Sequence, residues 1–282
     1  MSRSNRFAGV LGWPIRQSLS PVLHTHWLKE NDIAGSYVAL AVPREEFEST
    51  VASLPARGFV GANVTIPHKE AAFALASELD EDARLTGAVN VLVFEAGKVR
   101  GMNTDARGFL ASLKQGLGPE AAQRGPAVVL GAGGGARGVV LGLIRAGASE
   151  IRLLNRTREK ADALAALFKD KASITVMNWA EWRPAFDRAT LLVNTTSLGM
   201  TGKPALDISL DGLAQGAGVI DIVYNPLETD LLRRARARGH ATVDGLGMLM
   251  YQAVPAFANW FGVTPRVTPA LRNALEEKLR RG

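Results

Sequence analysis

The stretch Gly131-Ala-Gly133-Gly-Gly-Ala136-Arg-Gly138 decides the fold. It follows directly on the apolar run Ala127–Leu130, which is typical of a buried strand, and it opens the helical pattern Ala136–Arg145. A glycine-rich turn between a strand and a helix is the context in which G-x-G-x-x-[GA] marks a dinucleotide site. The glycines let the backbone approach a pyrophosphate, whose charge rests on the helix N-terminus. An ordinary structural turn is the alternative, and the context favours the dinucleotide site.

Strand and helix patterns alternate on both sides of this stretch. Before it, the predicted strands are Phe7–Leu11, Tyr37–Val42 and Phe59–Ile66, followed by an edge hairpin of Val89–Phe94 and Val99–Met102. The helices expected among them are one that opens at Ser20-Pro21 with Ser20 as its cap, Glu45–Leu54 and Lys69–Leu79. After it, we expect strands at Ile151–Leu154, Leu191–Asn194 and Val219–Ile222, with a helix at Glu159–Phe168. This alternation indicates an α/β protein built from βαβ units around parallel sheets.

Two domains fit the length of 282 residues. The segment 115–126, rich in glycine and proline, lies near the expected boundary. We expect a first, substrate-binding and catalytic α/β domain at 1–105 and a Rossmann-type nucleotide domain at 106–244. Two C-terminal helices, Leu246–Phe261 and Pro269–Leu279, have no strand after them. They are expected to return to the first domain, so that residues 245–282 belong to it.

The strand after the glycine-rich turn predicts which nucleotide binds. An NAD enzyme usually carries Asp or Glu about 20 residues on, where it binds the ribose 2′-hydroxyl. This chain has Asn155-Arg-Thr-Arg-Glu-Lys160 there. Cations would attract a 2′-phosphate, and they are locally unfavourable at a helix N-terminus without an anion. NADP is therefore the predicted cofactor, bound by Gly131, Ala132, Gly133, Gly134, Gly135, Asn155, Arg156, Thr157, Arg158 and Lys160.

Polar segments in the first half of the chain predict a substrate site. Ser18 and Ser20 place two hydroxyls at a helix entrance, where an anion is favoured. Lys69 follows Pro67 and falls in the first turn of a helix, against the helix dipole, and such locally unfavourable choices mark functional positions. The segments Gly87–Asn90 and Asn103–Asp105 put further polar groups at the ends of the hairpin.

The composition excludes several classes of protein. The chain has no cysteine, which excludes disulfides and thiolate chemistry and suits the cytoplasm. Its N-terminus does not have the pattern of a signal peptide, and no window approaches the ~18 apolar residues of a membrane helix. The four histidines are scattered, so we expect no metal site. The net charge of +6 suits small anions, and the basic run Arg233–Arg238 is expected to be a solvated helix face, so we expect no nucleic acid or membrane partner.

The motifs, taken in order, resemble those of the shikimate dehydrogenase family, and the resemblance covers nearly the whole chain. The most specific of them are Gly61–Glu70 (GANVTIPHKE) and Asp244–Gln252 (DGLGMLMYQ). The others are Ser18–Pro21, Gly87–Asn90, Asn103–Asp105, the glycine-rich turn, Asn155–Thr157 and Asp221–Pro226 (DIVYNP). Two departures are small: Gly135 stands where many members have Ala, and Ile222 is one hydrophobic variant at a tolerant site.

The resemblance implies the reversible reduction of 3-dehydroshikimate by NADPH to shikimate, a step towards chorismate and the aromatic amino acids. It implies that Lys69 is the acid/base and that Asp105 is its partner. It further implies that the substrate carboxylate and hydroxyls are bound by Ser18, Ser20, Thr65, Asn90, Asp105, Tyr224 and Gln252. Glu81, Ile222 and Gly245 match positions that touch the cofactor.

Three alternatives stay open at this point. A quinate/shikimate dehydrogenase could prefer NAD or accept both cofactors, although Arg156 argues against NAD preference. A non-catalytic NADPH sensor could keep the fold, although Lys69 and Asp105 are intact. An RNA-binding protein could use the basic charge, but no aromatic-plus-basic motif is present. Both a monomer and a homodimer fit the sequence.

Overall fold

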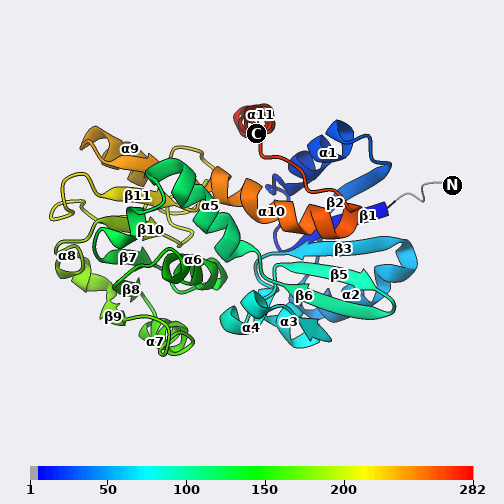
Figure 1. Ribbon diagram of the computed structural model, residues 1–282, viewed down its shortest axis with the longest axis horizontal. Helices are drawn as coiled ribbons and strands as arrows, with labels where there is room; N and C mark the ends of the chain where they lie inside the picture. The colour runs from blue at the N-terminus through cyan, green and yellow to red at the C-terminus, as the bar shows by residue number, and fades with distance from the viewer. Residues whose placement is uncertain (1–5, 282) are drawn as a thin grey trace. The chain divides into compact units, whose positions relative to one another are not determined.

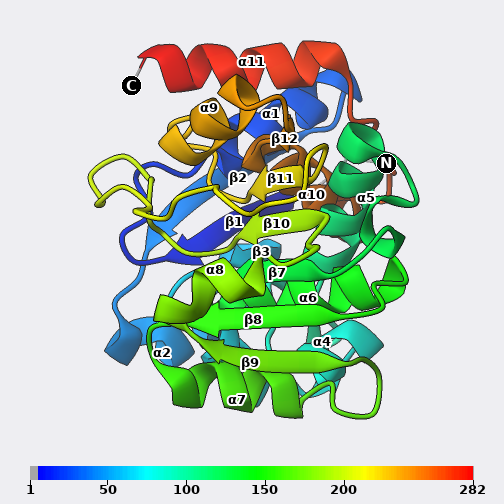
Figure 2. The same ribbon diagram turned by 90° about the vertical axis from the view of Figure 1, so that its left-hand side faces the viewer.

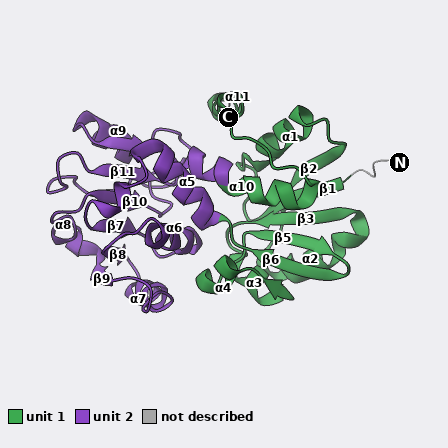
Figure 3. Cartoon of the chain, in the orientation of Figure 1, with its two compact units in different colours: residues 1–104, 252–282 green, residues 105–251 purple. Residues whose placement is uncertain are grey.

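The computed structural model describes residues 6–281 and divides into two compact units (Figures 1 and 3). Unit 1 comprises residues 1–104 and 252–282, and unit 2 comprises residues 105–251. The boundary between residues 104 and 105 is one residue from the expected boundary after 105. The boundary between residues 251 and 252 falls inside helix α10 (Gly245–Phe261), whereas the expected one precedes that helix. Within the described residues, no helix combines the length and the apolar character needed to cross a membrane.

Unit 1 is built on a six-stranded sheet in the order β2-β1-β3-β5-β6-β4. Every strand runs in the same direction except β5, which is antiparallel to both of its neighbours. The expected α/β character is confirmed here. The strands are β1 (Arg6–Gly12), β2 (Gly35–Ala41), β3 (Phe59–Val64), β4 (Glu78–Leu79), β5 (Val91–Glu95) and β6 (Lys98–Met102), and the helices before α10 are α1 (Ser20–Glu30), α2 (Phe47–Ser53), α3 (Lys69–Leu75) and α4 (Glu81–Thr86).

The helix predicted over Lys69–Leu79 is shorter than expected. Helix α3 ends at Leu75 because Ala76 takes an extended conformation, with φ −67° and ψ 128°. The next residues form the short strand β4, which pairs with β6 at Arg100 and Gly101. The predicted hairpin of β5 and β6 is present, but β4 lies outside it and forms the sheet edge.

A cluster of aromatic rings joins the C-terminal helices to the start of unit 1. His24 of α1 stacks on Tyr37 of β2 with ring centroids 4.1 Å apart, and Phe257 and Trp260 of α10 lie against the same ring. Helix α11 (Pro269–Arg281) contacts α1 and buries Leu271 and Leu275. The expected return of the C-terminal helices to the first domain is confirmed, and burial in this cluster lowers the pKa of His24 to about 3.

The His24 environment predicts a loss of stability in acid. The folded-state pKa lies below the unfolded value of 6.5, so only the unfolded chain binds a proton as the pH falls below 6.5. Relative to a His24→Phe variant, the unfolding free energy of the wild type is expected to fall by about 2 kcal/mol between pH 6.5 and 5. Urea unfolding followed by tryptophan fluorescence at each pH measures this difference. A difference that does not change with pH would contradict it.

Unit 2 contains a sheet of six parallel strands in the order β12-β11-β10-β7-β8-β9, which Figure 2 shows side by side. Counted from β7, this is the strand order 3-2-1-4-5-6 of the doubly wound dinucleotide fold, so the predicted Rossmann domain is confirmed. The strands are β7 (Ala127–Leu130), β8 (Ile151–Asn155), β9 (Ile174–Asn178), β10 (Leu191–Asn194), β11 (Gly218–Asp221) and β12 (Ala241–Val243), and the helices before α10 are α5 (Asp105–Leu117), α6 (Gly134–Arg145), α7 (Arg158–Ala166), α8 (Trp182–Ala185) and α9 (Asp230–Ala237).

Candidate active site

Two of the predicted substrate residues of unit 1, Thr65 and Asn90, lie together at one end of its strands. Strands β1 and β3 end there, with Leu11 paired to Val64. Because β5 runs in the opposite direction, it begins at this same end of the sheet, directly after Asn90. The backbone N–H of Val64 donates to the Asn90 carbonyl over 2.8 Å, so Thr65, the next residue, lies beside Asn90.

Asn90 is held in a buried group of amide and hydroxyl side chains. Its Nδ2 donates to Thr104 Oγ1 at 2.9 Å and to Gln252 Oε1 at 3.2 Å. Its Oδ1 accepts the backbone N–H of Thr104 at 2.8 Å. The Thr104 hydroxyl also donates to the Gln252 carbonyl at 2.8 Å. The structure therefore brings two predicted residues, Asn90 and Gln252, together through Thr104, a residue that the sequence analysis did not assign.

Ser18 and Ser20 lie at the entrance of α1, but the expected capping role of Ser20 is wrong. Ser20 is the first residue of the helix, Leu19 precedes it as the cap, and no side chain caps the helix. Instead the backbone N–H of Ser20 donates to Ser18 Oγ over 3.3 Å. The two serines are therefore adjacent in space. Since Ser20 does not cap the helix, capping does not account for its presence.

Lys69 is the first residue of α3, as predicted, and its side chain is half-buried. Its backbone carbonyl accepts the N–H of Val89 at 2.9 Å. The preceding residue, His68, is buried, stacks on Phe47 with ring centroids 4.6 Å apart and places its Nε2 2.7 Å from the Val42 carbonyl oxygen. These contacts fix the start of α3. Burial is the main cause that lowers the pKa of His68, and the Val42 contact opposes it.

The glycine-rich loop of unit 2 follows β7 at the point where the strand order reverses. Gly131 has φ +103°, a conformation that favours glycine, and a side chain there would lie 2.7 Å from Thr195 Oγ1. Thr195 itself donates twice to the Leu130 carbonyl, from its N–H at 2.8 Å and its hydroxyl at 2.7 Å. Helix α6 then begins at Gly134 with neither a side-chain cap nor an acidic residue in its first turn. Its first N–H groups fit a pyrophosphate.

The basic residues after β8 have different environments. Arg158 begins α7 and contacts Asp162 at 3.6 Å and Asn178 Oδ1 at 3.2 Å. Arg156 and Lys160 are exposed, and neither is in an ion pair within residues 6–281. Asn155 shapes the turn by donating from Nδ2 to the Thr157 carbonyl at 2.7 Å. Arg156 and Lys160 follow β8, the strand next to the one that leads into the glycine-rich loop. Two such cations, with no carboxylate partner among residues 6–281, fit a 2′-phosphate.

The remaining predicted residues are divided between the units. Asp105 is the first residue of α5 in unit 2 and is buried. Ile222 and Tyr224 follow β11 in the same unit and are half-buried, and Gly245 begins α10. Glu81 begins α4 in unit 1, where it is exposed. The side chains assigned as acid/base and partner thus come from different units, Lys69 from unit 1 and Asp105 from unit 2.

Two family descriptions match this chain. Residues 10–92 match the shikimate dehydrogenase substrate binding domain, and residues 115–199 match shikimate / quinate 5-dehydrogenase. The shikimate dehydrogenase (NADP(+)) of Paramagnetospirillum magneticum is 52% identical over 96% of this chain and 98% of its own length. This chain belongs to the shikimate dehydrogenase family. The corresponding enzyme of Ruegeria sp. is 49% identical over 95% of this chain and 97% of its own length.

Solved structures of the family share the whole fold. Shikimate 5-dehydrogenase of Thermus thermophilus, solved with NADP(H) and shikimate, is 38% identical with a TM-score of 0.84, over 98% of this chain and 99% of that one. Quinate dehydrogenase of Corynebacterium glutamicum, solved with NAD, is 29% identical with a TM-score of 0.88, over 98% and 99% of the two chains. Members of this fold therefore differ in both cofactor and ring substrate.

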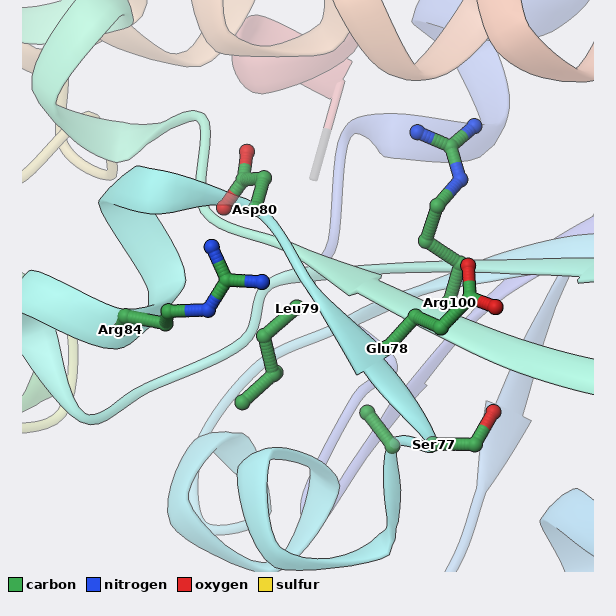
Figure 4. Close-up of a pocket in the computed structure, with 7 residues that line it drawn as sticks. Ser77, Glu78, Leu79, Asp80, Arg84 and Arg100 are labelled. Carbon is green, nitrogen blue, oxygen red and sulfur yellow. The ribbon is translucent and has the colours of Figure 1, made fainter.

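A separate pocket of about 480 Å³ lies beside β4 in unit 1 (Figure 4). Arg84 reaches it from α4 and Arg100 from β6. Asp80 in its wall caps α4 by accepting the N–H of Ala83 at 2.7 Å. Its remaining lining residues are Ala76, Ser77, Glu78 and Leu79. The predicted site residues are not among those that line it, so this pocket is not part of the candidate active site.

Proposed function

We propose that this protein catalyses the reversible reduction of 3-dehydroshikimate by NADPH to shikimate. The carrying observation is the 52% identity, over nearly the full length, to an NADP-dependent shikimate dehydrogenase. Two further observations support it. Buried amide and hydroxyl side chains surround Asn90, and the cations Arg156 and Lys160 of the nucleotide unit form no ion pair within the described part of the chain. The reaction is a step in the formation of chorismate and the aromatic amino acids.

The cofactor, when bound, supplies the hydride that reduces the ketone carbon. The α6 N-terminus and the loop from Gly131 to Gly135 hold its pyrophosphate through backbone N–H groups. Arg156 and Lys160 bind the 2′-phosphate, and Asn155, Thr157 and Arg158 shape that end of the pocket. Glu81, Ile222 and Gly245 are assigned to cofactor contacts by their match to the family pattern.

The substrate is held by its carboxylate and its hydroxyls. Ser18 and Ser20 donate to the carboxylate. The net charge of +6 supports the choice of an anionic substrate. A preformed set of hydrogen-bonding groups orients the ring without reorganisation during the reaction. The groups assigned to the ring hydroxyls are Thr65, Asn90, Asp105, Tyr224 and Gln252.

Lys69 transfers the proton that accompanies the hydride. In the reduction its ammonium donates a proton to the developing alkoxide, and in the reverse direction its amine accepts the hydroxyl proton. Asp105 is assigned as the partner of Lys69 and to the substrate hydroxyl by its match to the family pattern. The support for this assignment is the place of Lys69 at the first residue of α3, with that turn fixed by His68.

A matrix of four assays tests the function: shikimate or quinate, each with NADP or NAD. We expect shikimate with NADP to give the highest kcat/KM. Replacing shikimate by quinate, or NADP by NAD, should lower it at least tenfold. Equal rates with NAD would support a dual-cofactor enzyme, and a preference for quinate would support a quinate dehydrogenase. Absence of activity in all four assays, with NADPH still bound, would support the non-catalytic sensor.

The serine pair gives a prediction about substrate binding. The double change Ser18→Ala and Ser20→Ala is expected to raise KM for shikimate by about ten- to a hundredfold, because hydrogen bonds to a charged group are lost. The ground state and the transition state share this contact, so kcat should fall less than kcat/KM. NADPH affinity should stay at the wild-type value. An unchanged KM would remove both serines from the substrate site.

We further propose a cytoplasmic location and a monomer or homodimer as the working form. The location is supported by the cofactor, since the reaction draws on the NADPH of the cell interior. Cell fractionation tests the first point and light scattering of the purified enzyme tests the second.

A further inference from the structure

The last residue of β11, Asp221, is a buried carboxylate that the function above does not use. Its Oδ1 accepts from Asn194 Nδ2 at 3.0 Å and from the backbone N–H of Val223 at 3.0 Å, and its Oδ2 accepts from the Thr229 hydroxyl at 2.7 Å. Its side chain has no exposed surface. All three donors are neutral, so burial raises the pKa of Asp221 to about 6. Burying a carboxylate without a cation is costly, which points to a role other than packing.

One side of this carboxylate fixes the loop after β10. Asn194, which donates to Asp221, accepts the N–H of Thr196 at 3.0 Å and its hydroxyl at 2.7 Å on Oδ1. Thr195, between them, is bound to the Leu130 carbonyl and lies against Gly131. The Asp221–Asn194 pair therefore supports the loop that packs on the first glycine of the nucleotide site.

The other side fixes the segment after β11. Asp221 holds the N–H of Val223, and the Val223 carbonyl accepts the N–H of Gly245 at 3.2 Å. A side chain at Gly245 would overlap the carbonyl of Ile222, so only glycine allows this approach. The Ile222 side chain extends towards α6, where its Cδ1 would be 2.9 Å from a side chain at Gly135. Ile222 is thus held over the start of the pyrophosphate-binding helix.

We infer that Asp221 is a positioning residue that, through Asn194 and Val223, sets the surface against which the nicotinamide end of the cofactor lies. This inference rests on the proposed function. A carboxylate suits the task because it only accepts, and all its partners donate. An amide at the same position would turn an N–H towards one of these donors and leave a buried hydrogen bond unmade.

Asp221→Asn tests the inference, with two ligands that separate the ends of the cofactor. NADPH spans both ends, whereas 2′,5′-ADP carries only the adenine end and its 2′-phosphate. We expect the Kd of NADPH to rise about tenfold and kcat to fall about tenfold, while the Kd of 2′,5′-ADP stays within about twofold. A purely structural residue would lower Tm without this split between the two ligands.

Asp211→Asn is the matched control, because it makes the same change at an exposed aspartate of unit 2 that pairs with Arg238 and Ser209. It should leave both Kd values and kcat unchanged. If Asp221→Asn does not fold, Asn194→Ser breaks the same pair from its other side and should give the same split. Equal weakening of both ligands, or no change in either, would overturn the inference. Wild-type protein that binds NADPH but does not reduce 3-dehydroshikimate would instead overturn the proposed function.

Discussion

Lys69→Ala is expected to lower kcat by roughly 10²–10⁴, the usual contribution of a general acid/base. The variant should fold normally, because Lys69 contributes its backbone carbonyl, and not its side chain, to the bond with Val89. Binding of NADPH and of shikimate should stay near wild-type values, since neither depends on proton transfer. Steady-state kinetics, thermal unfolding and ligand titration on the one variant measure all three quantities.

The alternative is that Lys69 serves only as a structural cation, because ion pairs with a purely structural role are also common. That role predicts a lower Tm with kcat largely kept. Lys98→Ala is a matched control in the same unit, because Lys98 is exposed and pairs only with Glu78, at 2.6 Å, among the ion pairs of residues 6–281. Its kcat should equal that of the wild type, and Lys69→His should recover part of the lost activity. A kcat within a few-fold of wild type for Lys69→Ala would contradict the assignment.

Arg156→Asp is expected to weaken NADP binding far more than NAD binding. Loss of a charge-assisted contact to the 2′-phosphate costs about 1–3 kcal/mol, or roughly five- to 150-fold in Kd. The new carboxylate would in addition repel the phosphate and could accept from the 2′-hydroxyl of NAD. Fluorescence titration with both reduced cofactors gives the ratio of the two affinities.

Arg188→Asp provides the control for a general effect of charge. Arg188 is an exposed arginine of unit 2 that lies beside Asp187 at 3.6 Å, and its replacement changes the net charge by the same amount. It should leave the NADP to NAD ratio unchanged. Equal losses of NADP and NAD affinity in Arg156→Asp would show that the 2′-phosphate is bound elsewhere.

The central strands of unit 2 could be predicted closely because they are buried on both faces. Strands β7 and β10 match the expected ranges, Ala127–Leu130 and Leu191–Asn194, to the residue. Strand β9 was not predicted, because as an edge strand it has only half-buried and exposed residues and so carries a weak apolar signal. Helix α5 was also missed, since glycines at 108 and 116 resemble loop residues in the sequence.

Parts of the candidate site that lie within a local motif could be placed from the sequence, whereas contacts between distant parts of the chain could not. The place of Lys69 at a helix start follows from the proline two residues before it. The bond from Thr104 to Gln252 joins residues 148 positions apart, and no local pattern reports it. Asp221 belongs to the motif Asp221–Pro226, but its burial and its three hydrogen-bond donors arise only in the fold, where β10, β11 and the start of α9 pack together.

The path of the chain through its two units affects the order in which they can form during synthesis. Unit 2 is one continuous segment, whereas unit 1 needs both ends of the chain. When residue 251 leaves the ribosome, Phe257 and Trp260 have not yet emerged, so the ring of His24 lacks two of the aromatic rings that lie against it. The second unit along the chain can therefore complete its core first, and the nascent N-terminal segment carries exposed apolar surface until helix α10 has been made.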